Sequence, residues 1–469
     1  MTVVWEVISG VLVLLGIVSA GHALLSKRDP RAAWGWIVAC LTLPGVGAAL
    51  YWLMGVNRIR TRARTWKAEG QWGGTGWARH GQHAPPPVSG DAVSALMHVA
   101  DHVTGLPLLG GNRVRLLHNG EEAYPAMLDA IATARETVYL STYIFRTDQT
   151  GRRFVDTLAA AAERGADVRV LLDGLGLWYS WPHATRALKG TKARVSRFLP
   201  LGRGLHLNLR NHRKLLIVDG RMGFTGGLNI GDHHLADRDD PRRVVDLHVE
   251  VDGPVVEHLE AAFLDDWAFS TRERAAPRPP RSRPSAGSAW CRGISAGPNE
   301  DFEKLYWIVL GALSAARRHL RIMTPYFIPD RALISALDTA ALRGVRVEVV
   351  LPRRNNLPYV AWAARALLWE ILHYGVRVYF QPAPFVHTKL LLVDEEYSLL
   401  GSANLDPRSL RLNFEFDLEV YDGDVAKCLA RHFDEIRDRS REVTPEELDR
   451  RPFPIRLRDA AAKLLSPYL

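Results

Sequence analysis

The chain has 469 residues, of which 47% are apolar, and this composition excludes a disordered protein and predicts two or three domains with buried cores. Its formal charge of +9 indicates an anionic partner, either nucleic acid or an anionic lipid surface. The three cysteines, Cys40, Cys291 and Cys428, lack the spacing of a zinc site or a disulfide framework, so we expect neither.

Two apolar runs open the chain, at about residues 7–25 and 32–56. Each is long enough to cross a hydrocarbon core of about 30 Å, so residues 1–66 are predicted to form a two-helix transmembrane hairpin. A cleaved signal peptide is the alternative for the first run, but no basic segment precedes it and a second apolar run follows at once. Two buried helices of a soluble protein are another alternative. Aromatic residues near the ends of the second run favour the membrane, as interfacial anchors: Trp34, Trp36, Tyr51 and Trp52.

Basic residues flank the second run on both sides. The side that follows it is the more basic and contains Arg58, Arg60, Arg62, Arg64 and Lys67. Because cytoplasmic flanks of membrane helices carry the excess of Lys and Arg, the long carboxy-terminal part is predicted to lie in the cytoplasm.

Residues 67–90 are rich in Gly, Pro, His and Gln, which predicts a flexible linker. From residue 91 onward, helical periodicity alternates with apolar strands, as in the helix-to-strand segment that ends in RGADVRVLLD at Arg164. The same pattern returns as RGVRVEVVLP at Arg343, which indicates an internal repeat.

This repeat predicts an α/β fold of two duplicated domains, each a mixed β-sheet covered by helices, packed face to face. The first domain is predicted at residues 91–269 and the second at residues 290–469. A segment rich in Pro, Arg and Ser at residues 270–289 is the predicted linker between them.

One short motif occurs once in each half. The first copy reads NHRKLLIVDGRMGFTGGLNIGD, and the second reads VHTKLLLVDEEYSLLGSANLD. His, Lys and Asp recur at the same intervals in both, followed by small residues and an Asn: His212, Lys214, Asp219 and Asn229, then His387, Lys389, Asp394 and Asn404. An imidazole and an ammonium two residues apart on an extended chain point to the same side, and small residues let donors approach an anion, so the motif suits phosphate chemistry.

The pair of motifs resembles the HxKxxxxD signature of the phospholipase D superfamily, in which two motifs meet across a pseudo-twofold axis to form one active site. The resemblance implies that the six motif residues are the catalytic set. By the same resemblance Glu415 and Asp246 orient the two imidazoles, and Asn413 also matches the pattern. One departure concerns Val245, since bacterial cardiolipin synthases usually carry Arg immediately before the acid at position 246.

The residue types allow a two-step displacement at phosphorus. A neutral imidazole can attack a phosphodiester, and a protonated one can deliver a proton to the departing alcohol. The two lysines, with Asn229 and Asn404, are expected to hold the non-bridging oxygens, so no metal or other cofactor is predicted. The motif aspartates, Asp219 and Asp394, are more suited to fixing loop structure than to reacting.

Further segments resemble bacterial cardiolipin synthases, including NGEEAYPAMLDAI, STYIFRTD, TPYFIPD and GSANLDPRS. The resemblance implies a multi-pass enzyme of the bacterial cytoplasmic membrane that joins two phosphatidylglycerols into cardiolipin and releases glycerol through a phosphohistidine. His212 is the expected nucleophile by resemblance alone. A membrane-bound phospholipase D, another phosphatidyltransferase and a membrane-tethered nuclease are the alternatives, although the membrane hairpin argues against nucleic acid. Phosphatidylethanolamine is the alternative to phosphatidylglycerol as the second lipid substrate.

Three segments could face the membrane: Leu175–Pro182, with two Trp and one Tyr; the helical Tyr359–Leu372; and the basic, amphipathic residues 453–469. Packing inside the protein is the alternative for each of them.

Overall fold

The computed structural model describes residues 2–27, 30–56, 91–200, 209–273, 285–298, 301 and 303–466. The predicted linker at residues 67–90, the basic cluster from Arg58 to Lys67 and most of the predicted linker at residues 270–289 lie outside the described residues. The chain divides into two compact units, an amino-terminal helical unit and an α/β unit that contains both motifs.

The amino-terminal unit begins with α1 (Thr2–Ser26), and Val3–Ser26 is long and apolar enough to cross a membrane, with a mean hydropathy of 2.3. The predicted second span is not one continuous helix. Instead it consists of α2 (Pro30–Thr42), α3 (Val46–Leu50) and a π-helical turn, η1 (Tyr51–Gly55). The helix breaks because Pro44 has no N–H to donate and because Gly45 adopts a φ of 82°, which lies outside the right-handed helical region.

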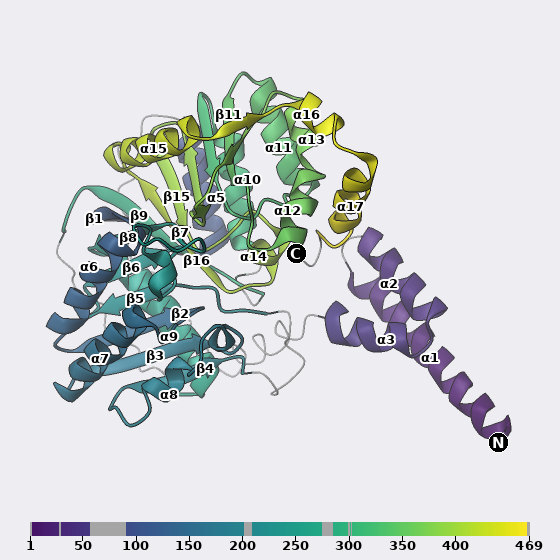
Figure 1. Ribbon diagram of the computed structural model, residues 1–469, viewed down its shortest axis with the longest axis horizontal. Coiled ribbons are helices and arrows are strands. Elements are labelled where there is room, and N and C mark those ends of the chain that lie inside the picture. Colours follow the sequence, from purple (N-terminus) through teal and green to yellow (C-terminus); the bar gives the residue numbers. More distant parts are fainter. Residues whose placement is uncertain are drawn as a thin grey trace. The chain divides into compact units, whose positions relative to one another are not determined.

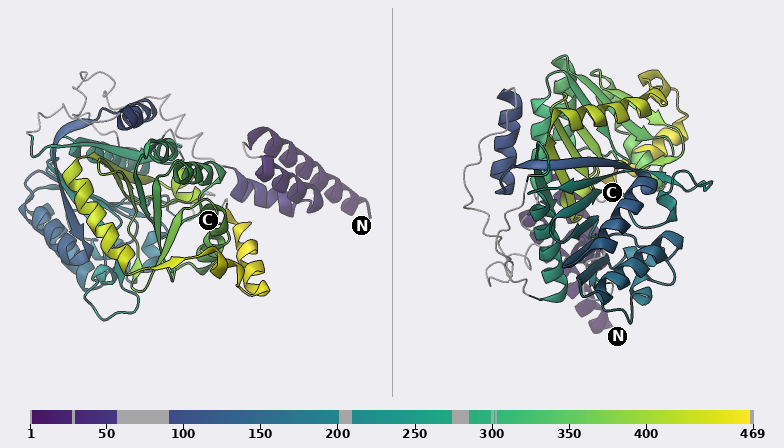
Figure 2. Two further views of the ribbon diagram at one scale, coloured as in Figure 1. Left: turned by 90° about the horizontal axis from the view of Figure 1, so that it is seen from above. Right: turned by 90° about the vertical axis from the view of Figure 1, so that its left-hand side faces the viewer.

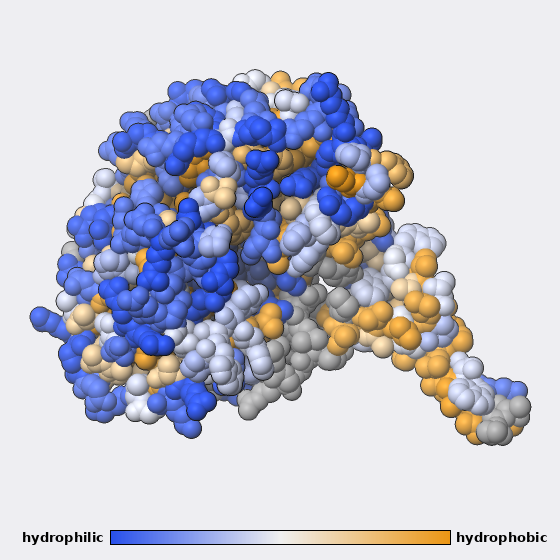
Figure 3. Space-filling model, viewed as in Figure 1, coloured by the Kyte–Doolittle hydropathy of each residue, from blue (hydrophilic) through white to orange (hydrophobic). Residues whose placement is uncertain are grey.

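Within this unit, the short elements of the second run pack against α1. The Tyr51 hydroxyl lies 2.6 Å from Nδ1 of His22, and Nε1 of Trp52 donates to Oγ of Ser19 at 2.9 Å. Tyr51 is therefore a buried packing residue, whereas Trp34 is 68% exposed, as an interfacial anchor requires. Apolar side chains cover much of the visible surface of these helices (Figure 3).

The α/β unit is built on one sheet of fifteen strands (Figure 1). The strands of its first half are β1 (Leu109–His118), β2 (Thr137–Thr142), β3 (Asp167–Asp173), β4 (Arg194–Phe198), β5 (Leu215–Val218), β6 (Met222–Gly226) and β8 (Leu247–Asp252). Those of the second half are β9 (Ala289–Ala296), β10 (His319–Met323), β11 (Arg346–Pro352), β12 (Arg377–Gln381), β14 (Leu390–Val393), β15 (Tyr397–Gly401), β16 (Glu415–Tyr421) and β17 (Arg441–Val443). A separate two-stranded parallel pair joins β7 (Val244–Val245) to β13 (Phe385–Val386).

The strand order confirms the duplication. From the central antiparallel pair β1–β9, the first half continues outward as β8, β6, β5, β2, β3 and β4, and the second as β16, β15, β14, β10, β11 and β12, followed by β17. In each half the three strands β2–β3–β4 or β10–β11–β12 are parallel. The pairing of β1 with β9 was not predicted. It joins the two halves edge to edge, while β6 also contacts β15 and β16 across them.

The helices of the first half are α5 (Asp91–Thr104), α6 (Asn119–Thr133), α7 (Gln149–Glu163), η3 (Gly176–Tyr179), α8 (Ala184–Ala187), η4 (Asp232–His234) and α9 (Val256–Thr271). Those of the second half are α10 (Lys304–Ala315), α11 (Arg331–Leu342), α12 (Pro358–Arg365), α13 (Leu368–Leu372), α14 (Pro407–Arg411), α15 (Gly423–Asp438), α16 (Pro445–Asp449) and α17 (Phe453–Lys463). Side-chain caps fix where several begin: the Asp148 carboxylate accepts from the N–H of Gly151 at the start of α7, and Asp330 and Asp422 cap α11 and α15 likewise.

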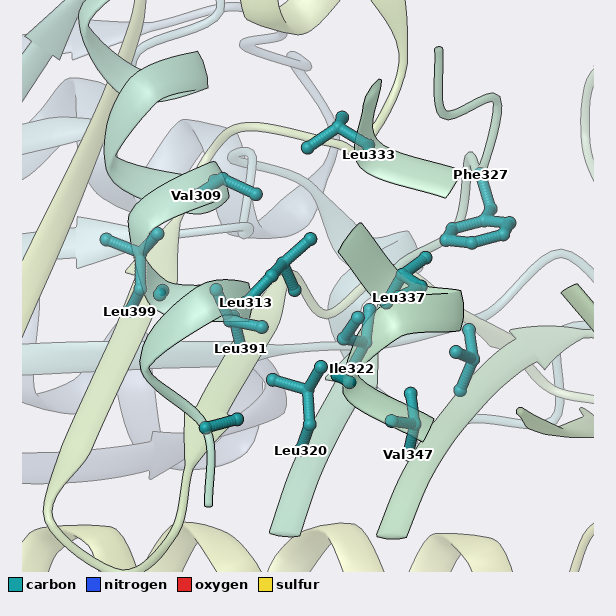
Figure 4. Packing of buried hydrophobic residues seen from close by; sticks show 14 of the residues in the cluster. Val309, Leu313, Leu320, Ile322, Phe327, Leu333, Leu337, Val347, Leu391 and Leu399 are labelled. Atoms are coloured by element: carbon teal, nitrogen blue, oxygen red, sulfur yellow. The ribbon is translucent and has the colours of Figure 1, made fainter. Parts of the chain in front are cut away.

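The core of the second half lies between its sheet and helices α10 and α11 (Figure 4). Apolar strand residues such as Leu320 and Val347 face Leu313 of α10 and Leu337 of α11. Helix α5 of the first half also belongs to this core, because its Leu96 is buried in the same cluster and α5 contacts α10 (Figure 2). The order of elements along the sequence did not predict that α5 packs in the core of the second half.

Candidate active site

The two motif histidines lie just before β5 and β14, in extended segments outside the main sheet, and not on strands as the sequence had indicated. Their backbone N–H groups bond to the opposite half. His212 N donates to the carbonyl of Phe414 and His387 N to that of Val245, both at 2.8 Å. The histidine segments leave their own strands because they pair across the two halves.

The imidazoles are held by carboxylates that also come from the opposite half. Nδ1 of His212 lies 2.9 Å from Oε2 of Glu415, and Nδ1 of His387 lies 2.8 Å from Oδ2 of Asp246. The two ring centroids are 6.5 Å apart. Because a carboxylate can only accept, each Nδ1 carries the hydrogen, and Nε2 is the atom left for chemistry.

The two carboxylates have different surroundings. Glu415 also accepts from Oγ of Ser402 at 2.6 Å and from Nδ2 of Asn413 at 3.1 Å. At the position in the first motif that matches Ser402 stands Gly227, where an added Cβ would lie 2.3 Å from Oδ1 of Asp246. The shorter acid therefore needs glycine beside it, whereas the longer acid accommodates a serine that bonds to it.

Burial and charge determine the protonation states of these groups. Burial lowers the pKa of His212, although Glu415 raises it, and burial, Lys389 and Lys214 together hold the pKa of His387 well below its ordinary value. Burial alone would raise the pKa of Glu415, but its contacts with His212 leave it below the ordinary value. Before substrate binds, both imidazoles are therefore neutral near pH 7 and Glu415 is ionised.

The motif lysines place two further nitrogens beside the histidines. Nζ of Lys214 donates to the carbonyl of His212 at 2.5 Å, and Nζ of Lys389 donates to the carbonyl of His387. Burial is the main cause that lowers the pKa of Lys214 to about 7 and that of Lys389 to about 8. A bound anion would favour their charged forms, since it supplies the counter-charge that burial withholds.

The motif aspartates bind backbone and not the histidines. Asp394 accepts from the backbone N–H groups of Arg317, Arg318 and His319, where β10 begins. Asp219 accepts in the same way from the three residues that lead into β2. Both aspartates have a left-handed φ, 51° and 52°, which Asp tolerates better than most residues. They hold the turn at the end of each motif strand, as residues that fix loop structure would.

The two asparagines predicted to bind phosphate are buried close to the motifs. Oδ1 of Asn229 accepts from the backbone N–H of Ile144 at 3.1 Å. Nδ2 of Asn404 donates to Oγ of Ser409 at 3.2 Å, and its Oδ1 has no partner among the described residues. Their role toward phosphate stays a prediction.

Sequence reasoning missed two residues that complete the site. Arg213 is buried between the halves, where Nε donates to the carbonyl of Glu415 at 3.0 Å and Nη1 donates to Asp266 at 2.7 Å. Its signal in the sequence is the large cation between the motif His and Lys, where the second motif has Thr388. Tyr143 places its ring centroid 5.3 Å from that of His212, and no local pattern indicated this contact.

One histidine outside the motifs, His234, lies beside the site. His234 is buried with its ring centroid 6.4 Å from that of His387, and its Nε2 accepts from the backbone N–H of Asn229. Burial lowers its pKa to about 3, so it packs as a neutral ring. Within the part of the chain that the structure describes, no three His, Cys, Asp or Glu side chains converge in a metal-binding cluster.

A family model described as "Cardiolipin synthase, PLD-like domain" matches residues 127–267 and 309–437, and each matched segment contains one histidine motif. The chain belongs to the cardiolipin synthase family. A second model, described as "Phospholipase_D-nuclease N-terminal", matches residues 12–55, which include most of α1 and the interrupted second run. The family resemblance noted at the two histidine motifs is thereby confirmed.

Curated cardiolipin synthases align with almost the whole chain. It is 31% identical to the major cardiolipin synthase ClsA of Bacillus subtilis (strain 168), over 94% of this chain and 95% of that protein. It is 32% identical to cardiolipin synthase A of Pseudomonas putida KT2440, over 98% of this chain and 97% of that protein.

A solved structure shares the fold of the α/β unit. The crystal structure of phosphatidylserine synthase from Haemophilus influenzae Rd KW20 superimposes with a TM-score of 0.63 and covers 81% of this chain and 100% of that one. Their sequences are 18% identical, so the comparison supports the duplicated α/β architecture alone.

Proposed function

We propose that this protein is a cardiolipin synthase that transfers the phosphatidyl group of one phosphatidylglycerol to a hydroxyl of a second, giving cardiolipin and glycerol. Membership of the cardiolipin synthase family supports a phosphatidyltransferase of the phospholipase D type. The observation that carries the mechanism is the crossed pair of histidine–carboxylate contacts, His212 with Glu415 and His387 with Asp246.

In the first step, Nε2 of His212 attacks the phosphorus of a phosphatidylglycerol. A P–N bond forms and the P–O bond to the terminal glycerol breaks, while Nε2–H of His387 gives its proton to the departing alkoxide. The products are a phosphatidyl-histidine and free glycerol. Ionised Glu415, which accepts from Nδ1–H, stabilises the positive charge that this imidazole gains.

In the second step, the glycerol site takes a second phosphatidylglycerol. Nε2 of His387 removes the proton of its hydroxyl, the oxygen attacks phosphorus, and the P–N bond to His212 breaks. Both histidines return to their starting forms, so the two steps balance without a further reactant. His212 as nucleophile is supported by its family resemblance and by the three hydrogen bonds that hold Glu415 beside it.

The lysines explain how His387 obtains the proton that it must give. Positive charge on Lys389 and Lys214 is one cause of its low pKa. A phosphodiester bound between the two lysines would neutralise that charge and raise the pKa of His387, so substrate binding would charge the acid. Asn229 and Asn404 are the proposed partners for the remaining phosphate oxygens.

The proposal is tested with purified full-length protein in mixed micelles of detergent and phosphatidylglycerol. Lipids and glycerol are separated by chromatography, for the parent chain and for His212→Ala and His387→Ala. We expect cardiolipin and glycerol in equal amounts from the parent and neither from the two variants. His373→Ala, a change at an exposed histidine, is the matched control and should keep full activity.

Exchange of labelled glycerol into phosphatidylglycerol reports on the first step, because a phosphatidyl-histidine that has released glycerol can take up labelled glycerol in its place. Phosphatidic acid formed without cardiolipin would mean that water is the acceptor and that the chain is a hydrolase. Adding phosphatidylethanolamine identifies any second acceptor lipid. A nucleic-acid substrate is not expected, and cleavage of DNA or RNA lost in both histidine variants would overturn the lipid assignment.

We also propose that the amino-terminal unit crosses the cytoplasmic membrane twice, with α1 as the first span and α2, α3 and η1 together as the second. Broken helices are tolerated at membrane depth where protein surrounds them, and the contacts of Tyr51 and Trp52 with α1 support this. Ser26→Cys should then react with an impermeant maleimide from outside the cell. Native Cys428, in the α/β unit, should react only after permeabilisation; labelling of Cys428 in intact cells would contradict a cytoplasmic catalytic unit.

A further inference from the structure

The segment Leu175–Pro182, between β3 and α8, exposes two tryptophans on the surface of the α/β unit. Trp178 is 66% exposed and Trp181 is 78% exposed, and Tyr179 between them is 49% exposed. Such side chains are normally covered in a soluble protein, whereas Trp and Tyr are enriched where a protein meets the headgroup region of a membrane. We call this segment the tryptophan loop.

The tryptophan loop is anchored in one conformation. The Asp173 carboxylate accepts from the N–H groups of Leu175 and Gly176, both at 2.9 Å. At the other end, Thr147 donates from its N–H to Oγ of Ser180 and from its hydroxyl to the carbonyl of Pro182. The exposed rings are therefore held by the fold, and their exposure is a built feature of the surface.

One histidine supports both tryptophans. The ring centroid of His183 lies 5.3 Å from that of Trp178 and 5.1 Å from that of Trp181, edge to face in both cases. Nδ1 of His183 is within hydrogen-bonding distance of the carbonyls of Leu177 and Ser180. The two indoles are thus fixed beside each other.

The tryptophan loop adjoins the catalytic site. The ring centroid of Tyr179 lies 6.0 Å from that of Tyr143, whose ring in turn lies 5.3 Å from that of His212. In addition, Asp173, which caps the loop, accepts from the backbone N–H of Asn211 at 2.8 Å. Whatever surface the tryptophan loop binds is therefore brought next to the nucleophilic histidine.

Positive charge surrounds the tryptophan loop. Arg186 on α8, Lys189 just after it and Arg197 on β4 are exposed, and none forms a salt bridge with an acid in the described part of the chain. Basic residues beside exposed Trp match an anionic lipid surface, where each charge adds to the attraction. Because these residues are basic, an anionic bilayer fits this surface better than an apolar protein partner does.

The other two segments with membrane-facing composition have partners inside the protein. Helix α12 contacts α17, and the Arg458 guanidinium of α17 stacks over the ring of Trp362 at 4.4 Å. Lys463 of α17 forms a salt bridge with Glu370 of α13 at 2.8 Å. These contacts bury one face of each element, although Phe453 and Leu457 of α17 stay 73% and 58% exposed; no contact among the described residues covers the outer faces of Trp178 and Trp181.

We propose that the tryptophan loop docks the catalytic unit onto the surface of a bilayer that contains anionic phospholipid, with Trp178 and Trp181 inserted among the headgroups. The site would then open at the bilayer surface, so that phosphatidylglycerol reaches His212 without crossing water. This surface deepens the proposed function and rests on it for the identity of the lipid. Insertion of Trp178 and Trp181 into the bilayer does not depend on which reaction the site catalyses.

Insertion is measured directly by fluorescence. In a Cys428→Ser background, where Cys40 and Cys291 are buried, Trp181→Cys is labelled with bimane and the full chain is reconstituted into phosphatidylglycerol vesicles containing brominated phosphatidylcholine. Trp369→Cys is the matched control, because Trp369 is 57% exposed on α13. We expect quenching at position 181 that is at least threefold greater than at position 369. Equal quenching at the two positions would overturn the proposal.

Turnover supplies a second measurement. The Trp178→Ala/Trp181→Ala variant should lose about tenfold of its activity on phosphatidylglycerol in vesicles, since the two indoles no longer hold the site at the surface. Its activity on monomeric, short-chain phosphatidylglycerol below the micelle concentration should stay within about twofold of the parent. Equal losses on both substrates would assign the tryptophans to the catalytic site or to stability, and would overturn docking.

The two measurements separate this proposal from the proposed function. If no variant or parent made cardiolipin while position 181 was still quenched, the function would fail and the docking surface would stand. If the parent made cardiolipin and position 181 was as unquenched as position 369, the docking surface alone would fail.

Discussion

Replacing Glu415 with Gln removes the negative charge beside His212 and keeps the volume of the side chain. The carboxylate accepts three hydrogen bonds, from Nδ1 of His212, Oγ of Ser402 and Nδ2 of Asn413. An amide has one carbonyl oxygen, so the Gln variant can satisfy the donors at the Oε2 position only by turning its NH₂ group toward Asn413. One buried donor then faces another.

The Gln variant loses a negative charge and a hydrogen-bond acceptor; the first loss should affect kcat and the second the free energy of unfolding. The missing charge matters when the imidazole becomes cationic, and a hydrogen bond to a charged group contributes about 1.5–3 kcal/mol, so kcat should fall by up to about two orders of magnitude. The orphaned Asn413 amide is present throughout the cycle, so it should lower the free energy of unfolding by about 1–3 kcal/mol and leave the KM for phosphatidylglycerol unchanged.

The assay follows cardiolipin formation over a range of surface concentrations of phosphatidylglycerol, together with thermal unfolding of each variant. Ser402→Ala is the matched control, because it removes one hydrogen bond to Glu415 but keeps the charge; this bond is present throughout the cycle, so its loss should lower the free energy of unfolding by about 1.5–3 kcal/mol and leave kcat within about fivefold of the parent.

A kcat for the Gln variant that is no lower than that of Ser402→Ala would refute the reasoning, because the charge would then contribute nothing beyond the hydrogen bond.

Three further predictions concern pH and stability. The kcat/KM for phosphatidylglycerol should fall as pH rises past about 7 to 8, since Lys214 and Lys389 are charged below their lowered pKa values and neutral above them. Lys214 has the lower pKa and loses its charge first, so Lys214→Arg should move the fall to higher pH, and a profile flat to about pH 9.5 in the parent would contradict this cause. Asp394→Ala should lower the free energy of unfolding by about 2–4 kcal/mol, because three partly buried backbone N–H groups lose their acceptor. An Asn variant that is destabilised equally would point to charge and not to hydrogen bonding. Arg213→Met should cost about 3–5 kcal/mol of unfolding free energy by leaving the buried Asp266 carboxylate without its cation, and adding Asp266→Leu should recover only part of it, because Nδ2 of Asn211 then loses its acceptor. A single-variant cost below about 1 kcal/mol in thermal unfolding would show that the pair is not needed.

The sequence by itself determined the repeat, the residue types of the site and most of the regular structure. Helices α6 and α7, strands β2 and β3, and their counterparts in the second half follow from periodicity, because a helix or strand with one buried face must repeat its apolar residues at that period. The two His–Lys–Asp intervals could likewise be recognised without the structure, because the spacing of residues along one short segment is local information.

The second apolar run shows where local information was insufficient. Its composition predicted one helix, yet Pro44 and Gly45 divide it, and Tyr51 turns inward to His22. A hydropathy pattern measures how apolar a run is. It does not register that Pro44 lacks an N–H group or that Gly45 has a positive φ.

Only the tertiary structure decided which acid serves which histidine. His212 is paired with Glu415 at a separation of 203 residues, and His387 with Asp246 at 141 residues, each across the two halves. The sequence placed one motif and one acid in each half and gave no reason for the exchange. That exchange arises because the backbone N–H of each histidine pairs with the strand end just before the opposite acid, and such pairing depends on how the two halves meet in space.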